Sequence, residues 1–231
     1  MEPPVVVLTG AGVSTPSGIP DFRSPNGIWK RFDPKEFTID RFHADPARFW
    51  ERRKALTLET RILDAEPNDA HHAIARAVQE GRVATVVTQN IDGLHIRAGT
   101  PEEALIEVHG NVHRSRCMDC RGSQSTRDLI DALVPGEAPR CGCGGLLRPD
   151  VVLFGEPVTE LERSARAVAD ARTLVVAGSS LSVWPVAGLV ESACSQGAEV
   201  VLVNRDPTPF DGRVAHILRG PVEEELSRLF A

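Results

Sequence analysis

The stretch VVVLTGAGVS, residues 5–14, places a run of aliphatic side chains directly before a glycine-rich turn. Three more valine-rich runs, at residues 83–87, 174–177 and 200–203, also end in small or polar residues. Short apolar runs of this kind are typical of strands that are buried on both faces, as in parallel sheets. Ligands of open α/β sheets bind at the carboxyl ends of the strands. We therefore expect these four strand ends to meet at one binding crevice.

Helical patterns separate the apolar runs. We expect one helix to start at the Asp-Pro pair of residues 45–46 and to continue to about Leu63. A second helix, capped by Asn68 or Asp69, is expected to run through Gln79. The alternation of strands and helices predicts an α/β fold with a Rossmann-like parallel sheet covered on both faces.

The composition describes an acidic globular chain. Its 231 residues are 42% hydrophobic and 25% charged, and the formal net charge is −6. A sequence-independent nucleic-acid binder needs a basic surface, so we expect no nucleic-acid partner. Residues 1–8 lack the features of a signal peptide, and no run approaches the roughly 18 apolar residues of a membrane span. We therefore expect a cytoplasmic protein without a membrane partner.

Four of the five cysteines form two close pairs, Cys117-x-x-Cys120 and Cys141-x-Cys143. The segment between them is polar and too poor in apolar residues to build a core of its own. A bound metal would supply the stability that such a core would otherwise give. Four thiolates suit a closed tetrahedral zinc site with a structural role and no open position for a catalytic water. Reduced cysteines without metal are the alternative. We expect Cys194, outside the cluster, to be a small core residue.

The glycine turn alone is a weak sign of dinucleotide binding. Gly10 and Gly12 permit a tight turn near a pyrophosphate, but Thr15 stands where the fingerprint has its third glycine. An ordinary glycine turn is the alternative. The continuation is loop-like, and within it Arg23 can contact phosphate and Phe22 can shield a reactive sugar carbon from water. The alternative for Phe22 is a core aromatic.

Six segments match, in order, the sequence pattern of the sirtuin family: GAGVS at 10–14, GIPDFR at 18–23, TQNIDGLH at 88–95, His109-Gly110, LRPDVVLFGE at 147–156 and GSSL at 178–181. The chain resembles that family over nearly its whole length. The resemblance implies an NAD-dependent protein-lysine deacetylase or deacylase, in which NAD is a consumed co-substrate. Nicotinamide leaves, the acyl group passes to ADP-ribose, and the products include O-acyl-ADP-ribose.

His109 matches the family's general base. An imidazole titrates near neutral pH and can therefore take a hydroxyl proton. For His71, His72, His113 and His216 we expect structural roles. The resemblance also assigns catalytic and ribose- or nicotinamide-binding roles to Asn90 and Asp92, although an Asp-Gly pair can be a simple turn.

The resemblance further implies a set of NAD-binding residues. It comprises Gly10, Ala11, Gly12, Ser14, Thr15, Asp21, Phe22, Arg23, Gln89, Asn90, Ile91, Asp92, Gly178, Ser179, Ser180, Asn204, Arg205, Asp206 and Val222. At the adenosine side the alternative is that serine and asparagine are simply frequent at strand ends.

Substrate binding is expected along residues 151–156. The resemblance implies that Val151, Val152, Phe154, Gly155 and Glu156 hold an acyl-lysine protein or peptide as an added strand, with weak sequence preference. An ordinary buried strand is the alternative.

Two departures from the family pattern bear on function. The chain has no tyrosine, so the Tyr of the pair that family members use for malonyl or succinyl groups is missing, and we expect acetyl or another uncharged acyl group. Arg52 or Arg53 nevertheless lies in the region where the resemblance places the Arg of that pair. The second cysteine pair is closer than is usual, and Gly142, Gly144 and Gly145 can let this loop bend.

We divide the chain into two units. A Rossmann-like NAD-binding catalytic domain takes residues 1–30, 78–112 and 148–231. A small domain combines a helical insert at 31–77 with a zinc-binding insert at 113–147.

Three other functions are considered. A mono-ADP-ribosyltransferase would cleave NAD in the same way but add mass to a protein. A non-catalytic NAD sensor would not need a general base such as His109. A hydride-transferring dehydrogenase is disfavoured by the interrupted glycine fingerprint and the loop after Ser14.

Overall fold

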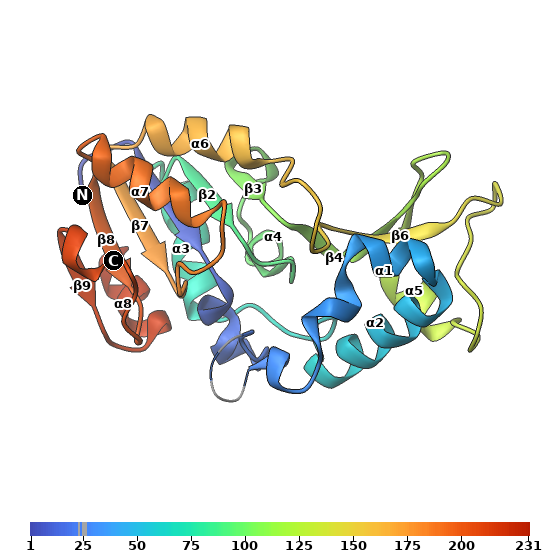
Figure 1. The fold of residues 1–231 in the computed structure, drawn as a ribbon. Helices are drawn as coiled ribbons and strands as arrows, with labels where there is room; N and C mark the ends of the chain where they lie inside the picture. The colour runs from blue at the N-terminus through green and yellow to red at the C-terminus, as the bar shows by residue number, and fades with distance from the viewer. Residues whose placement is uncertain (23, 25–26) are drawn as a thin grey trace.

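The computed structural model describes all residues except 23, 25 and 26, and its main feature is a six-stranded parallel sheet (Figure 1). The strand order is β3-β2-β1-β7-β8-β9. The strands are β1 (Val5–Thr9), β2 (Thr85–Thr88), β3 (Leu105–Glu107), β7 (Thr173–Ala177), β8 (Glu199–Val203) and β9 (His216–Leu218). The four predicted apolar runs become the adjacent central strands β2, β1, β7 and β8, which confirms the α/β prediction.

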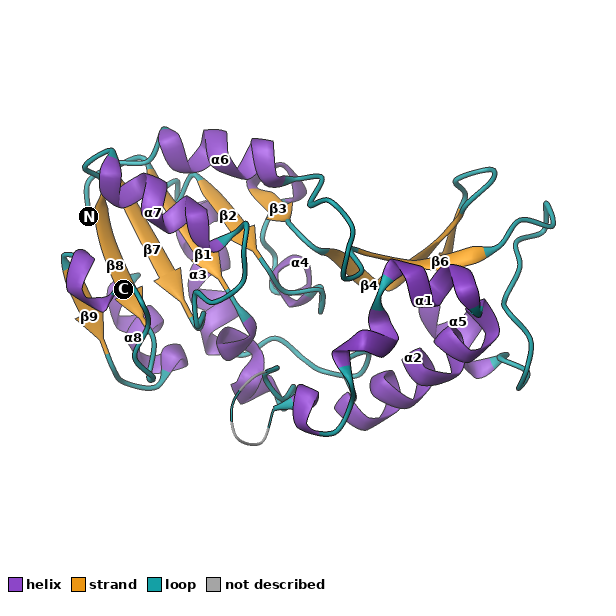
Figure 2. Ribbon diagram, viewed as in Figure 1, coloured by secondary structure: helices purple, strands orange, loops and turns teal. Residues whose placement is uncertain are grey.

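Helices cover both faces of this sheet (Figures 1 and 2). Leu8, Val176 and Leu202 point toward α6 (Leu161–Ala169) and α7 (Ala187–Ser195). The neighbouring strand positions point to the opposite core, which α3 (Asp69–Gln79) and α8 (Val222–Leu229) complete. Because helices pack on both faces of the sheet, nearly every side chain of the central strands is buried. This explains why the valine runs are not interrupted by polar residues.

The two predicted helices form with the expected starts. The side chain of Asp45 accepts a hydrogen bond from the backbone N–H of Arg48 and caps α2 (Pro46–Thr60). Asn68 caps α3 by accepting from the N–H of Ala70 at 2.9 Å. Although we assigned α3 to the helical insert, its buried face packs on the large sheet beside α8.

A smaller body is built on the antiparallel sheet β5-β4-β6. Its strands are β4 (Gly110–Cys117), β5 (Ser123–Ser125) and β6 (Leu147–Val151). Aromatic side chains of α2 and the preceding loops fill its core, and the indole N–H of Trp50 donates to the carbonyl of Leu147 at 2.9 Å. The helical and cysteine-containing segments therefore share one core, although they are far apart in the sequence.

The remaining elements are short. They are α1 (Ile39–Ala44), α4 (Leu94–Arg97), α5 (Thr126–Asp131) and the 3-10 turns η1 (Ala11–Ser17), η2 (Ile28–Lys30), η3 (Pro34–Phe37), η4 (Glu102–Ala104) and η5 (Asp211–Arg213). None of the helices in the described part of the chain is both long and apolar enough to cross a membrane.

Candidate active site

A cleft of about 940 Å³ lies where the large sheet meets the smaller body. Residues that follow β1, β2, β7 and β8 line it, as expected for ligand sites at the carboxyl ends of parallel strands. Of the residues that the structure describes, all those predicted to bind NAD or substrate line this one cleft, and so does His109. Arg23 lies outside the described residues.

The glycine turn packs against the loop after β7. A Cβ atom on Gly10 or Gly12 would lie 2.8 Å from the carbonyl oxygen of Gly178, closer than a side chain tolerates. The N–H of Gly10 donates to Ala177, and that of Gly12 donates to Gly178 at 2.8 Å. Since both groups are used inside the protein, these glycines serve close loop packing and do not direct their N–H groups at a phosphate.

Behind the glycine turn, Ser14, Asn90 and Asp92 form a buried hydrogen-bond network. The Ser14 hydroxyl donates to Asp92 Oδ2 at 2.7 Å and accepts from Asn90 Nδ2 at 3.1 Å. Asn90 Nδ2 also lies 3.1 Å from the carbonyl of Gly10. The amide and the carboxylate therefore hold fixed orientations on one side of the cleft.

Burial raises the pKa of Asp92, because the residue is only 3% exposed and desolvation disfavours the charged form of its carboxyl group. The N–H of Leu94, which donates to Oδ1 at 2.9 Å, and the Ser14 hydroxyl act in the opposite direction. A cationic ligand near this carboxylate would favour its ionised form further.

His109 stands at the start of the smaller body, with its ring in the cleft. Its Nδ1 lies 2.8 Å from the carbonyl oxygen of Gln89. A carbonyl can only accept, so Nδ1 carries the proton in the neutral ring and Nε2 is the basic nitrogen. The backbone carbonyl of His109 accepts from Val152 at 2.9 Å, which links the histidine to the predicted substrate segment.

Two other histidines of the described chain have structural contacts. His71 accepts from the N–H of Asn68 at the start of α3, and burial lowers its pKa to about 2, so it stays neutral. His113 Nε2 lies 2.9 Å from the carbonyl oxygen of Asp92 and supports the backbone there. These contacts agree with the structural roles expected for both.

The far end of the cleft carries the polar residues after β7 and β8. Gln89 Nε2 donates to the Ser179 hydroxyl at 3.0 Å. Asn204 Nδ2 donates to the carbonyl of Asp206 at 2.7 Å, whereas the side chains of Arg205 and Asp206 are largely exposed. Exposed polar groups at a cleft rim can reach a ligand without losing an internal partner.

The predicted substrate segment is held from several sides. Gly110 pairs with Val151, and a Cβ on Gly110 would lie 2.2 Å from the carbonyl oxygen of Asp150, so only glycine fits. Glu156 accepts from both Nη atoms of Arg148 at 2.6 Å, while Phe154 is 42% exposed. Glu156 therefore shapes the loop, and Phe154 presents an apolar ring at the surface.

One wall of the cleft was predicted only in part, since Arg52 or Arg53 was the one position of this helix that we expected near the acyl group. Arg53, Leu56, Thr57 and Thr60 of α2 line it, although the Arg53 side chain is only 5% exposed. Arg53 and Thr57 are four residues apart and hence share a helix face with apolar neighbours. The sequence signal that could have identified this wall was the helical spacing of Arg53 and Thr57 within an otherwise apolar helix face.

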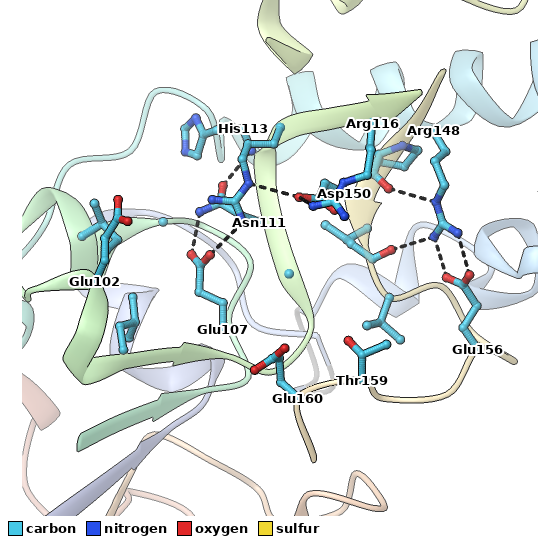
Figure 3. A pocket seen from close by; sticks show the side chains of 18 of the residues that line it. Glu102, Glu107, Asn111, His113, Arg116, Arg148, Asp150, Glu156, Thr159 and Glu160 are labelled. Carbon is cyan, nitrogen blue, oxygen red and sulfur yellow. Dashed lines mark hydrogen bonds and ion pairs between the residues drawn. The ribbon is translucent and has the colours of Figure 1, made fainter. Parts of the chain in front are cut away.

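A second cavity, of about 750 Å³, is lined by polar side chains of β3, β4 and β6 (Figure 3). Asn111 Nδ2 donates to Glu107 Oε1 at 2.6 Å, and Asn111 Oδ1 accepts from the N–H of His113 at 2.9 Å. Arg114 bridges Glu107 and Asp150, both at 3.1 Å. These contacts form a chain from the carbonyl of Asp92 to β6.

The four clustered cysteines meet at one point. Their sulfurs all lie within 4.8 Å of one another, with Cys117 and Cys143 at 3.5 Å and Cys120 and Cys141 at 3.7 Å. Zinc–sulfur bonds of about 2.3 Å place tetrahedral ligands about 3.8 Å apart, so the set fits one zinc ion. All five cysteines are free of disulfides.

The close second cysteine pair depends on glycine. Gly144 has a φ of +91°, and a Cβ on Gly145 would lie 2.6 Å from the sulfur of Cys117. The turn is closed by the N–H of Gly144, which donates to Cys141 at 2.8 Å. Gly144 therefore permits the left-handed turn after Cys143, and Gly145 permits the sulfur of Cys117 to approach the loop.

Comparison with known proteins identifies the family. The Sir2 family model matches residues 10–185. An NAD-dependent protein deacetylase of Haloarcula marismortui is 44% identical over 96% of this chain and 86% of its own length. One of Saccharolobus solfataricus is 38% identical over 97% of this chain and 90% of its own length.

Solved structures agree with the sequence match. A Sir2 variant with a deacetylated p53 peptide and 3′-O-acetyl ADP-ribose has a TM-score of 0.89 and 39% identity, and covers 97% of this chain and 91% of its own. A Sir2 complex with a p53 peptide and NAD⁺ has a TM-score of 0.85 and 38% identity, with the same coverage. The shared motifs, fold and cleft together show that this chain belongs to the Sir2 family.

Proposed function

We propose that this chain is an NAD-dependent protein-lysine deacetylase or deacylase. The observation that carries the proposal is the meeting of His109, Asn90 and Asp92 in one cleft at the ends of four parallel strands. The two relatives compared above are named NAD-dependent protein deacetylases, and similar structures contain NAD⁺ or acetyl ADP-ribose.

The proposed reaction converts acyl-lysine, NAD and water into lysine, nicotinamide and O-acyl-ADP-ribose. The bond between the lysine nitrogen and the acyl carbon breaks, and the acyl carbon becomes bonded to a ribose oxygen. NAD supplies an electrophilic ribose carbon and nicotinamide as the leaving group.

His109 is the proposed general base. The Gln89 carbonyl fixes the proton on Nδ1, so Nε2 can take a proton from a ribose hydroxyl in the cleft. Because the His109 carbonyl also holds Val152, the base and the substrate segment keep a constant relation to each other.

Asn90 and Asp92 are proposed to hold the ribose and the nicotinamide amide. The Ser14 hydroxyl orients both side chains, so neither has to rotate when the co-substrate binds. The buried carboxylate of Asp92 suits the positive charge of the nicotinamide ring, since ionisation becomes more favourable beside a cation.

The remaining NAD contacts are proposed along the rest of the cleft. The nicotinamide side takes Asp21, Phe22, Gln89 and Ile91, and Phe22 packs on Trp29 at a centroid distance of 5.2 Å. The phosphate and adenosine side takes the loops after β1, β7 and β8: Gly10, Ala11, Gly12, Ser14, Thr15, Gly178, Ser179, Ser180, Asn204, Arg205, Asp206 and Val222.

An acyl-lysine protein or peptide is the proposed partner. Val151, Val152, Phe154, Gly155 and Glu156 line the cleft next to His109. An extended substrate can add to this segment through main-chain hydrogen bonds, which give affinity with little sequence preference.

The four cysteines are proposed to bind one structural zinc ion. The small sheet is polar around them, and a closed set of four thiolates provides stability that its limited core does not. We further propose that the protein acts in the cytoplasm, because free clustered thiols suit a reducing compartment.

The test is to incubate the protein with an acetyl-lysine peptide, with and without NAD, and to follow all products by mass spectrometry. We expect NAD-dependent loss of acetyl together with nicotinamide and O-acetyl-ADP-ribose. Release of nicotinamide with an unchanged peptide and a heavier protein would instead establish ADP-ribosyl transfer.

A further inference from the structure

The loop after β8 carries the proposed adenosine end of the NAD site, although it has no regular secondary structure before η5. Residues 204–206 of this loop line the cleft. Thr208 and Phe210 anchor it behind the cleft, since both are buried, whereas residues 205–207 lie at the surface. An exposed segment of this kind keeps a fixed shape only where other groups bind its backbone.

Arg219 binds the backbone of this loop. It follows β9, the edge strand that pairs with β8 (Figure 1). Its Nη1 atom donates to the carbonyl of Asn204 and to the carbonyl of Asp206, both at 2.8 Å. Both hydrogens of this nitrogen are therefore used inside the protein, and they tie together the two ends of the segment 204–206.

Asp211 holds Arg219 in its turn. Nη2 of Arg219 donates to Oδ2 of Asp211. Oδ1 of Asp211 accepts from the backbone N–H of Thr208 at 3.0 Å and from its hydroxyl at 2.8 Å. Hydrogen bonds from Thr208, and then from Arg219, lower the pKa of Asp211, so its carboxylate stays charged at neutral pH. The contacts thus run from the buried part of the loop to the carbonyls beside the cleft.

The carbonyl of Asp206 also orients a side chain that is proposed to bind NAD. Asn204 Nδ2 donates to this carbonyl at 2.7 Å, next to the hydrogen bond from Arg219. Because the amide nitrogen is used in this way, Asn204 Oδ1 is the atom that can accept a hydrogen bond from a ligand hydroxyl. The direction of this acceptor therefore depends on the carbonyl that Arg219 holds.

Arg219 lines the cleft itself, so direct binding of a phosphate is the alternative role. Its hydrogen bonds favour backbone support, because three of its donor hydrogens already point at carbonyl and carboxylate oxygens. Arg205 differs, since its side chain is 79% exposed and its contact with Asp206 spans 3.8 Å. Arg205 can turn toward a ligand without losing a short hydrogen bond.

We propose that Arg219 is a positioning residue for NAD, which holds the loop after β8 in the shape that receives the adenosine. It acts through the carbonyls of Asn204 and Asp206, and Asp211 keeps it in place. This role rests on the NAD-dependent function proposed above. Arg219 should therefore affect the affinity for NAD and leave the chemical step at His109 unchanged.

The test measures Arg219→Met with an acetyl-lysine peptide. We expect the KM for NAD to rise about three- to tenfold, because a segment that has to be ordered on binding lowers affinity by about this factor. The kcat and the KM for the peptide should stay near their wild-type values. ADP-ribose should bind more weakly by the same factor in titration calorimetry, whereas nicotinamide mononucleotide, which lacks the adenosine, should keep its affinity.

Three further variants separate the role of Arg219 from a general effect of charge. Arg213→Met is the matched control, because Arg213 pairs with Glu191 at 3.0 Å outside the cleft, and it should keep the KM for NAD. Asp211→Asn should raise this KM less than Arg219→Met. Arg219→Lys should recover only part of the affinity, since an ammonium lacks the fixed fork of a guanidinium.

Hydrogen exchange separates positioning from overall stability. In Arg219→Met without ligand, the amides of residues 204–211 should exchange faster, and saturating ADP-ribose should restore their protection. An unchanged KM for NAD would overturn the role of Arg219. So would a fall in kcat, faster exchange across the whole large sheet, or an equal loss of affinity for nicotinamide mononucleotide and ADP-ribose.

The wild type separates this role from the deacylase function. If it binds ADP-ribose but deacylates no peptide, the deacylase function fails, and calorimetry still tests Arg219. If Arg219→Met binds ADP-ribose as well as an active wild type does, only the role of Arg219 fails. If the wild type does not bind ADP-ribose, both fail.

Discussion

At the residue scale, His109 has a sharply defined role because its tautomer is fixed. His109→Ala removes the proton acceptor at Nε2 and leaves the Ser14, Asn90 and Asp92 network intact. We expect turnover to fall by about 10²- to 10⁴-fold, the usual contribution of a general base. NAD affinity, measured by titration calorimetry, should change little, and a parallel loss of binding would contradict the assignment.

The buried carboxyl of Asp92 makes stability depend on pH. Because burial raises its pKa in the folded state, the folded protein holds this proton at a pH where the unfolded chain has lost it. Ionised Asp92 therefore lowers stability, and the loss develops as pH rises from the ordinary carboxyl pKa of about 4 through the raised value. Asp92→Asn should remove this loss.

Thermal melting from pH 4 to pH 8 checks the sign. The variant should melt above the wild type at pH 8, and the two curves should converge toward pH 4, where Asp92 is protonated. Activity should be lost at every pH, since the carboxylate is proposed to bind the co-substrate. A variant that is less stable at pH 8 would show that the hydrogen bonds from Ser14 and Leu94 outweigh desolvation.

The sequence predicted the positions of some residues of the cleft and not of others. The four strand ends were predictable because valine runs define strands and parallel strands end at one edge. The contact between Gly12 and Gly178 was not, since it depends on how closely two loops distant in sequence approach. Arg53 was noted only by region, because a helix with charged residues does not reveal which of two neighbouring arginines turns inward.

At the scale of elements, the cysteine turn gives a prediction with an internal control. Gly145→Ala places a methyl group 2.6 Å from the sulfur of Cys117, whereas Gly142→Ala meets nothing within 4 Å. We expect one zinc per chain in the wild type and in Gly142→Ala, and clearly weaker zinc retention in Gly145→Ala. Metal analysis after competition with a chelator measures this, and equal retention in both variants would contradict it.

Removal of the metal should act on the small sheet before the large one. The cysteines lie at the end of β4 and in the loops beside the small sheet. The three central strand pairs of the large sheet are instead buried between helix layers. Hydrogen exchange after chelation should therefore increase first in residues 110–151, up to the start of the substrate segment. The parallel sheet has its own core, which explains why the cysteine pattern and the valine runs could be interpreted independently from sequence.

At the scale of the whole molecule, the polar cavity links the large sheet to the smaller body (Figure 3). Glu107 lies on β3 of the large sheet, and it holds Asn111 and Arg114 of β4. Arg114 continues to Asp150 beside the substrate segment, and His113 continues to the carbonyl of Asp92. Glu107 is therefore placed to position both sides of the cleft without contacting a ligand there.

Glu107→Gln tests this coupling, with the exposed Glu103→Gln as control. The glutamine amide keeps one acceptor for Asn111 but loses the charge that faces Arg114. We therefore expect the variant to fold. The KM values for NAD and for the peptide should rise together by about two- to tenfold, which corresponds to a loss of about 1 kcal/mol. The difference in KM between the wild type and Glu107→Gln should shrink in high salt, because Arg114 is half exposed and salt screens its ion pairs. If only one KM changes, Glu107 supports a single wall of the cleft and the two bodies are positioned by other contacts.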